Sequence, residues 1–139
     1  CGYPGMKVLE FGVAGDSSNG YLMHNFTSPN CIAYVGTHDN ETLAGFLAGC
    51  KEWEINWMMG YFGILKKEEL HDQMIRKLYE SIANVVIIQM QDYLHLDNYC
   101  RINHPSTLGS NWQWRLRPGE MNQVNKEYYH WVCDMFSRH

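Results

Sequence analysis

The stretch Val85–Met90, VVIIQM, is a nearly continuous apolar run of strand length. Apolar residues without polar alternation are typical of a strand that is buried on both faces of a parallel sheet. Two further runs rich in β-forming residues precede it, at Met6–Val13 (MKVLEFGV) and Cys31–Val35 (CIAYV). Because segments with helical patterns separate the three runs, the sequence predicts an α/β fold whose three strands are parallel neighbours in chain order.

Helical patterns occupy much of the remaining chain. The clearest is Lys67–Ala83, in which apolar residues recur at three- and four-residue spacing, as an amphipathic face requires. We also expect helices at Glu41–Ala48, Glu52–Tyr61 and Glu120–Phe136. A long polar, turn-rich stretch at 92–118 precedes the last of them. The predicted apolar face of the clearest helix consists of Leu70, Met74, Ile75, Leu78 and Ile82.

Three strands in 139 residues are too few for a closed (β/α)8 barrel, which typically takes about 250 residues. The chain also opens at Cys1, without an initiator methionine or a secretory signal, and runs almost directly into a predicted strand. We therefore expect residues 1–139 to be the C-terminal portion, about the last three strands, of a single (β/α)8 barrel domain whose N-terminal portion is absent. Such a fragment would expose two strand edges and a half-covered core.

Composition and charge argue against several classes of partner. The chain has 15 acidic and 11 basic residues, a net charge of −4 and no basic run, which argues against a nucleic-acid partner. No stretch approaches the roughly 18 consecutive apolar residues of a membrane-spanning helix, so no membrane partner is expected. The five cysteines are scattered and form no C-x-x-C pair, which favours reduced thiols that pack as small apolar residues. We therefore expect a cytoplasmic protein.

Polar residues follow two of the predicted strands, and the C-terminal ends of strands are where barrel enzymes carry their working residues. Thr37, His38 and Asp39 come directly after the second strand. Asp92 and, further along, the stretch Arg101–Asn103 come after the third. Taken alone these residues are a weak signal, because turns and helix caps use the same residue types.

The residues alone leave other interpretations open. Asn40 is predicted to be the N-cap of the helix that follows, and the alternative interpretations are that Asp39 is a helix-cap carboxylate and His38 a hydrogen-bonded loop histidine. Asp92 is either a catalytic acid or the cap of the following turn. A metal site built from His24, His38 and Asp39 has suitable ligand types, although the spacing matches no compact zinc motif.

The aromatic residues are equally ambiguous. Trp112 and Trp114 either form a stacking platform for a sugar or pack their loop onto the body of the protein. Phe11, at a predicted strand end, has the same two interpretations. Neither pattern decides between binding and packing.

Six segments in chain order resemble the sequence blocks of amylomaltase-type 4-alpha-glucanotransferases, also called disproportionating enzymes, and together they span nearly the whole chain. Any one of them is weak evidence, whereas six in the family order are strong evidence. The segments are 2–11 (GYPGMKVLEF), 21–25 (YLMHN), 34–42 (YVGTHDNET), 91–94 (QDYL), 101–107 (RINHPST) and 111–115 (NWQWR). Members of this family are (β/α)8 enzymes that move a segment of one α-1,4-glucan to another by a retaining mechanism, without a metal or organic cofactor.

The resemblance implies roles for four residues. Asp39 would be the third catalytic carboxylate, which binds sugar hydroxyls at the cleaved subsite and stabilises the transition state. His38 would hydrogen-bond the same sugar ring, Asn103 would line the donor subsite, and Phe11 would contact an acceptor sugar. The nucleophilic aspartate and the acid/base glutamate of the family would lie before the GYPG block, outside residues 1–139. The chain alone would therefore be inactive.

Two other functions remain compatible with the residues. An amylase-type glycoside hydrolase of the same barrel clan also carries a His-Asp pair at a late strand end. A non-catalytic glucan-binding module would use Trp112, Trp114 and Phe11 instead. The six blocks favour the glucanotransferase, with α-1,4-glucans and maltooligosaccharides as its substrates.

Overall fold

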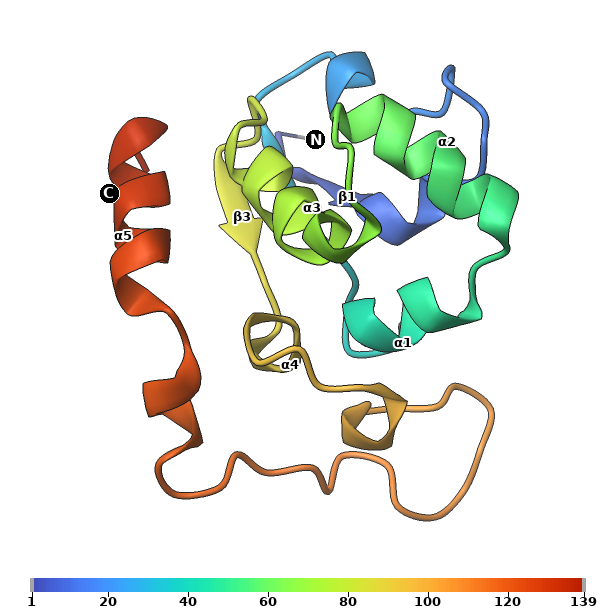
Figure 1. The fold of residues 1–139 in the computed structure, drawn as a ribbon, viewed down its shortest axis with the longest axis vertical. Helices are drawn as coiled ribbons and strands as arrows, with labels where there is room; N and C mark the ends of the chain where they lie inside the picture. The colour runs from blue at the N-terminus through green and yellow to red at the C-terminus, as the bar shows by residue number, and fades with distance from the viewer. Residues whose placement is uncertain (1, 139) are drawn as a thin grey trace.

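A three-stranded parallel sheet organises the chain (Figure 1). The computed structural model describes residues 2–138. Strand β2 lies between β1 and β3, and both pairings are parallel, with Gly5 opposite Cys31 and Ile32 opposite Val85. The predicted α/β class, strand order and direction are therefore confirmed. The strands are β1 (Gly5–Val8), β2 (Cys31–Tyr34) and β3 (Val85–Ile87).

The outer strands are shorter than their apolar runs. β1 ends at Val8 because the backbone folds into a 3₁₀ turn at Leu9–Phe11, which the N–H of Gly12 closes by donating to the Leu9 carbonyl at 2.8 Å. β3 ends at Ile87, and Met90 already begins the short helix α4 (Met90–Tyr93). The predicted strands at 6–13 and 85–90 were too long, since each carboxyl end turns into a loop.

Four longer helices pack around part of the sheet, and all of them follow β2 in the chain. The prediction that helices separate all three strands was therefore wrong for β1 and β2, which 3₁₀ turns connect without an α-helix. The predicted helix at 67–83 is a 3₁₀ turn followed by an α-helix that ends at Tyr79, so Ile82 lies outside it and is 53% exposed. The predicted helix at 120–136 likewise begins with a separate 3₁₀ turn. The helices are α1 (Leu43–Gly49), α2 (Glu52–Phe62), α3 (Leu70–Tyr79) and α5 (Lys126–Met135). The 3₁₀ turns are Met23–Asn25, Lys67–Glu69, Asn98–Cys100 and Glu120–Gln123.

The predicted N-cap of α1 was wrong by two residues. Thr42 caps the helix, and its hydroxyl accepts a hydrogen bond from the N–H of Gly45 at 3.2 Å. Asn40 serves its own turn instead, because its Oδ1 accepts from the N–H and the hydroxyl of Thr37 at 2.9 and 2.8 Å. The helix begins at Leu43, whose N–H donates to Oδ1 of Asp92 at 2.8 Å.

The core lies between the sheet and helices α1, α2 and α3. Burial of each such apolar side chain contributes about 1.5–3 kcal/mol, so the amphipathic face of α3 is a main source of stability. Helix α5 contacts α3, and its Val132 is fully buried. The fully buried core includes Val8, Ala33 and Val35 from the sheet region, and Leu43, Met58, Met74, Ile75 and Leu78 from the helices.

The end of the chain is tied back to the segment that follows α3. The guanidinium of Arg138 donates to the carbonyls of Tyr79, Ser81 and Ala83 at 2.5, 2.5 and 2.9 Å. A planar guanidinium with five N–H donors suits such a set of carbonyl acceptors. These bonds hold α5 against the body of the protein.

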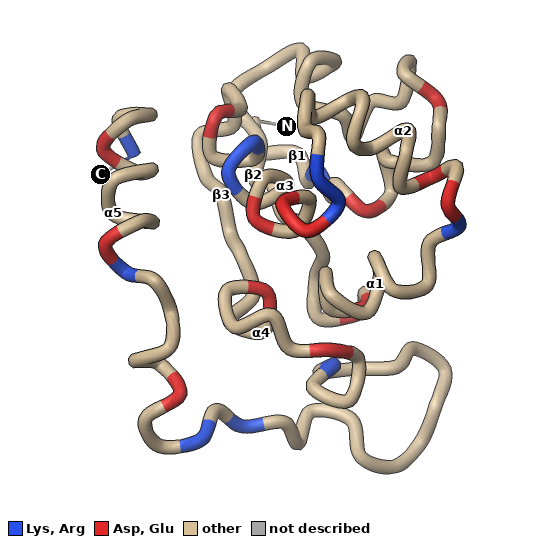
Figure 2. Tube along the Cα trace, in the orientation of Figure 1, with Lys and Arg blue, Asp and Glu red and all other residues tan. Residues whose placement is uncertain are grey.

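The thiols and the charges follow the expected pattern. Cys31 and Cys100 are buried as free thiols, Cys50 and Cys133 are half-buried, and Cys1 lies outside the described residues. Lysines and arginines are dispersed among acidic residues along the chain (Figure 2). Of the helices within residues 2–138, none has the length and apolar character needed to cross a membrane.

The apolar run at 85–90 predicted a strand buried on both faces of the sheet. This prediction was wrong, because part of the sheet is exposed. Val85 and Ile87 are each 44% exposed, and Met6 on β1 is 58% exposed. Within residues 2–138, β1 and β3 each pair only with β2, so both outer edges carry unpaired backbone groups. Exposed apolar strands with open edges are sites at which chains associate.

We predict that residues 1–139 expressed alone will aggregate or will lack cooperative unfolding, because the open edges and the apolar face of β3 remain uncovered. Sedimentation velocity and a thermal melt followed by circular dichroism test this. A monomer with a sharp two-state transition would contradict it.

Candidate functional site

The loop that follows β2 carries the two central residues of the site. It turns at Thr37–Asn40, where the N–H of Asn40 donates to the Thr37 carbonyl at 3.0 Å and the Asn40 side chain bonds back to Thr37. This double closure fixes the turn locally. His38 and Asp39 lie on it with half-exposed side chains, so both are held in place and both are accessible.

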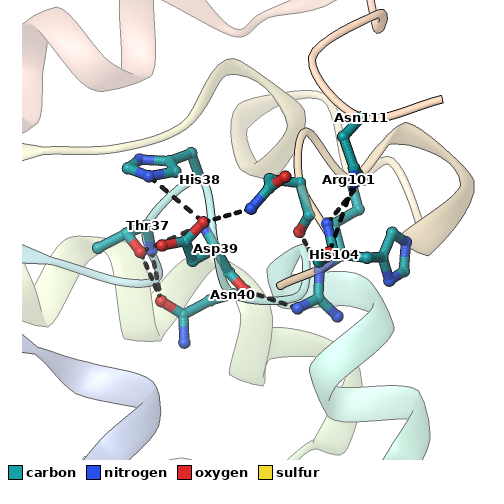
Figure 3. Close-up of polar contacts among 8 residues, drawn as sticks. Thr37, His38, Asp39, Asn40, Arg101, His104 and Asn111 are labelled. Atoms are coloured by element: carbon teal, nitrogen blue, oxygen red, sulfur yellow. Dashed lines mark hydrogen bonds and ion pairs between the residues drawn. The ribbon is translucent and has the colours of Figure 1, made fainter. Parts of the chain in front are cut away.

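A second loop, after α4, is bonded directly to the first (Figure 3). Asn103 Nδ2 donates to Asp39 Oδ1 at 2.7 Å, and the Asn103 N–H donates to the His38 carbonyl at 3.1 Å. Arg101 bridges the two loops, because its Nη2 donates to the Asp39 carbonyl at 2.5 Å and its Nε to the Asn103 carbonyl at 2.9 Å. Residues that are more than 60 positions apart in sequence therefore form one cluster.

His38 completes this cluster and lies beside Trp112. Its Nε2 is 3.4 Å from Asp39 Oδ1, and its ring lies 4.9 Å from the Trp112 ring at an angle of 41°. Trp112 has a φ of 65°, which is uncommon for a bulky residue, and its N–H donates to the Ile102 carbonyl at 2.7 Å. Oδ1 of Asp39 is thus occupied by its neighbours, whereas Oδ2 forms no hydrogen bond to any residue within 2–138.

Phe11 and Asp39 share a pocket of ≈ 230 Å³, which Glu10, Phe46 and Arg101 also line. Phe11 is 50% exposed, and its ring meets that of Tyr21 edge-on at 5.7 Å. All four sequence-predicted site residues therefore lie at the carboxyl end of the sheet. Asp39, His38 and Asn103 contact one another directly, and Phe11 lines the same pocket as Asp39.

Glu10 is a buried carboxylic acid in this pocket that the sequence analysis missed. It is 8% exposed, its Oε1 has no hydrogen-bond partner among the described residues, and it lies so close to Gly36 that a Cβ there would come within 2.7 Å of Oε1. Burial raises its pKa to about 9, and the carboxylates of Asp92 and Glu41 add to the shift. Its position as the one acidic residue within the apolar run at 6–13 could have indicated a buried carboxylic acid.

Asp92 is a structural residue. It is fully buried, its Oδ1 accepts from the N–H of Leu43, and its Oδ2 has no partner among the described residues. Burial raises its pKa to about 6, although the bond from Leu43 opposes this shift. Asp92 therefore caps α1, which is a helix earlier in the chain, and not the turn that follows it.

The alternative metal site is wrong. His24 bonds instead to the Tyr61 hydroxyl at 2.8 Å and to the Ser17 carbonyl at 2.9 Å. Within the part of the chain that the structure describes, no group of three His, Cys, Asp or Glu side chains is arranged to hold a metal ion. Trp112 lies against His38 and is 55% exposed, while Trp114 is half-buried, so sugar stacking on these tryptophans stays a hypothesis.

Comparison with known proteins agrees with these features. The sequence model of the 4-alpha-glucanotransferase family matches residues 1–122, most of the chain. This chain belongs to the 4-alpha-glucanotransferase family. It is 48% identical over 118 residues to the 4-alpha-glucanotransferase of Clostridium butyricum and 34% identical over 136 residues to that of Synechocystis sp.. These alignments cover 84% and 98% of this chain, and 24% and 27% of the relatives.

A solved structure of the family is similar throughout. The amylomaltase of Streptococcus agalactiae, determined in complex with acarbose, superposes with a TM-score of 0.90 at 33% identity. The match covers 99% of this chain and 28% of that amylomaltase. The chain thus spans about a quarter of the length of the 4-alpha-glucanotransferases that it matches.

The buried carboxylic acid of Glu10 predicts a pH-dependent stability. Because the folded pKa of Glu10 is about 9, well above its ordinary value of 4.5, the neutral form stabilises the fold at low pH, and this contribution is lost as the pH rises toward 9. Glu10→Gln stays neutral, so its melting temperature in the full-length protein should exceed that of the wild type increasingly between pH 5 and 9. We expect the melting temperature of Glu10→Gln to be roughly 5 °C above that of the wild type at pH 8. Differential scanning fluorimetry across this range is the measurement, and a difference that does not vary with pH would contradict the burial account.

Proposed function

We propose that the chain is the C-terminal part of a (β/α)8 4-alpha-glucanotransferase that moves segments of α-1,4-glucan between acceptors by a retaining double displacement. The supporting observation is the state of the Asp39 carboxylate. Its Oδ1 accepts a hydrogen bond from Asn103 and lies next to His38, whereas its Oδ2 has no partner among the described residues. Asp39 also lines the same pocket as Phe11.

The barrel assignment rests on topology. The three strands are parallel neighbours in chain order, α1, α2 and α3 connect β2 to β3, and the site loops follow the carboxyl ends of the strands, as in barrel enzymes. The open edges of β1 and β3 are where further strands of a barrel would pair. The superposition with an amylomaltase over 99% of this chain supports the same placement.

In this proposal Asp39 stabilises the transition state without bonding to the sugar. A retaining glycosyl transfer passes twice through an oxocarbenium-like state, in which hydrogen bonds to the ring hydroxyls strengthen and contribute several kcal/mol. A carboxylate oxygen is a strong acceptor for such hydroxyls, more so once the substrate excludes water. Because Oδ1 is occupied, Oδ2 is the oxygen that accepts from the sugar.

The neighbours of Asp39 have matching roles. Asn103 positions the carboxylate through its Nδ2 and presents its remaining amide oxygen to the donor subsite. His38 has Nε2 toward Asp39, and its Nδ1, which has no hydrogen-bond partner among residues 2–138, can bond the same sugar ring. Phe11, which lines the same pocket, offers a half-exposed aromatic face to an acceptor sugar.

The remaining parts of the reaction come from outside this chain. A double displacement needs a nucleophilic carboxylate and an acid/base carboxylate, and in this proposal both belong to the barrel segment that precedes residue 2. Carboxylates suffice for this chemistry, so we propose no metal or organic cofactor. Substrates are α-1,4-glucans and maltooligosaccharides, and the proposed location is the cytoplasm.

Replacing Asp39 tests this proposal. Asp39→Asn in the full-length protein preserves the shape of the side chain and removes its charge, so the loss should fall on the charged transition state more than on the neutral substrate. We expect kcat to fall by roughly 10²–10⁴, as when one electrostatic stabiliser is removed, with KM changed far less. Initial rates of maltotriose disproportionation measure both constants.

His38→Asn is the matched comparison and should cause a smaller loss, since His38 bonds a neutral hydroxyl. Product analysis in the same assays separates transfer from hydrolysis, because a transferase yields longer maltooligosaccharides and an amylase-type hydrolase only shorter ones. Near-normal turnover of Asp39→Asn would show that Asp39 is a structural loop residue and would contradict the proposed site.

A further inference from the structure

A second pocket, of ≈ 360 Å³, lies between α3, the segment after β3 and the start of α5. We call it the α3–α5 pocket. It shares no lining residue with the pocket of Asp39, and its volume lies within the range of about 300–1,000 Å³ of small-molecule sites. Its lining includes Asp72 and Gln73 of α3, Tyr93, Gln123, and Tyr128 and Tyr129 of α5.

Three tyrosine rings form the apolar part of this pocket. Tyr129 meets Tyr93 edge-on at 4.6 Å and 74°, and it meets Tyr128 at 5.1 Å and 72°. Because neighbouring rings are nearly perpendicular, the rings present both faces and edges, while the Tyr93 hydroxyl bonds to that of Tyr79 and the Tyr129 hydroxyl donates to Asp72 at 3.5 Å. An amphipathic ring of this kind suits a ligand that is apolar on one face and polar along its rim.

The polar part of the pocket offers both donors and acceptors. Asp72 accepts from His95 Nε2 at 3.0 Å, and this hydrogen bond lowers the pKa of Asp72 and raises that of His95. The side chains of Gln73, Gln123 and Glu69 form no hydrogen bond with any residue in 2–138, although all three line the pocket. Amides with no partner that flank a carboxylate fit a ligand with many hydroxyl groups, since each hydroxyl both donates and accepts.

Other ligand classes fit less well. Asp72 and Glu69 repel phosphate and other anions, and the uncommitted amides disfavour a purely apolar ligand. No three-ligand metal group occurs among the described residues. A neutral polyhydroxylated ligand is therefore the class that both the tyrosines and the amides favour.

We propose that the α3–α5 pocket binds one or two glucose units of a long α-1,4-glucan chain. The identity of the ligand rests on the proposed function, whereas the sugar-binding chemistry rests on the lining itself. The first turns of α3 and α5 line the pocket, and helices that follow parallel strands begin at the carboxyl end of the sheet. Because Asp39 lies at the same end, one long chain can reach both pockets, and a short one cannot.

The test compares long and short substrates in the full-length protein. Tyr128→Ala removes a ring and Gln73→Ala an amide, and neither residue touches the Asp39 cluster. Each variant should raise KM for amylose roughly five- to tenfold and leave maltotriose kinetics unchanged. His130→Ala, at an exposed position of the same helix outside the pocket, should alter neither substrate.

Binding decides the question even if transfer activity fails to appear. Titration calorimetry of amylose into the Asp39→Asn protein, with and without Gln73→Ala, should show the same five- to tenfold weakening. If Tyr128→Ala lowers the melting temperature, Gln73→Ala is the deciding variant, because it leaves the tyrosine rings in place and removes no hydrogen bond within residues 2–138. Unchanged amylose binding and KM in Gln73→Ala would overturn the proposal, and absence of transfer with intact amylose binding would overturn only the proposed function.

Discussion

The hydrogen bond from the N–H of Leu43 to the buried carboxylate of Asp92 joins two parts of the chain that are 49 residues apart, and the site is assembled around it. A helix start leaves N–H groups without internal partners, and a carboxylate there also interacts favourably with the helix dipole. Asp92 follows β3, so the bond fixes α1 relative to the third strand. The cost of burying the carboxylate appears as its raised pKa of about 6.

Asn98 extends this attachment toward the site. Its Oδ1 accepts from the N–H of Thr42 at 3.2 Å, and its Nδ2 donates to Glu41 Oε2 at 2.7 Å. Gly45 is required at this contact, because a Cβ atom there would overlap the Asn98 amide. With Asn98 held against α1, the chain reaches Arg101 at the position from which its guanidinium meets the loop of Asp39. Contacts of the buried Asp92 and the partly buried Asn98 and Arg101 thus position the loop that carries the candidate catalytic carboxylate.

Local patterns predicted much of this fold and part of this site. The three apolar runs and the spacing of α3 identify elements whose burial depends on their own sequence, and parallel order then places Asp39 and Asn103 at one edge of the sheet. The start of α1 was missed because Asn40 and Thr42 are both good caps, and Asp92, a distant residue, decides between them. The exposure of β3 was not predicted, because it depends on which other segments cover the sheet and not on the apolar residues of the strand itself.

The missed contacts of the site are likewise nonlocal. The contact of Trp112 with His38 requires a positive φ that no sequence rule assigns to tryptophan. The bridge from Arg101 to the Asp39 carbonyl joins a side chain to a backbone atom 62 residues away. Neither contact can be predicted from the spacing of residues in the sequence.

The most direct test of the proposed role of Asp39 is a crystal structure of the full-length protein with a thio-linked maltooligosaccharide that cannot be cleaved. We expect Oδ2 of Asp39 to accept hydrogen bonds from the hydroxyls of one sugar ring while Asn103 still donates to Oδ1. A sugar bound with Oδ2 facing away from it, or with Asn103 released from Asp39, would show that Asp39 does not have the proposed role.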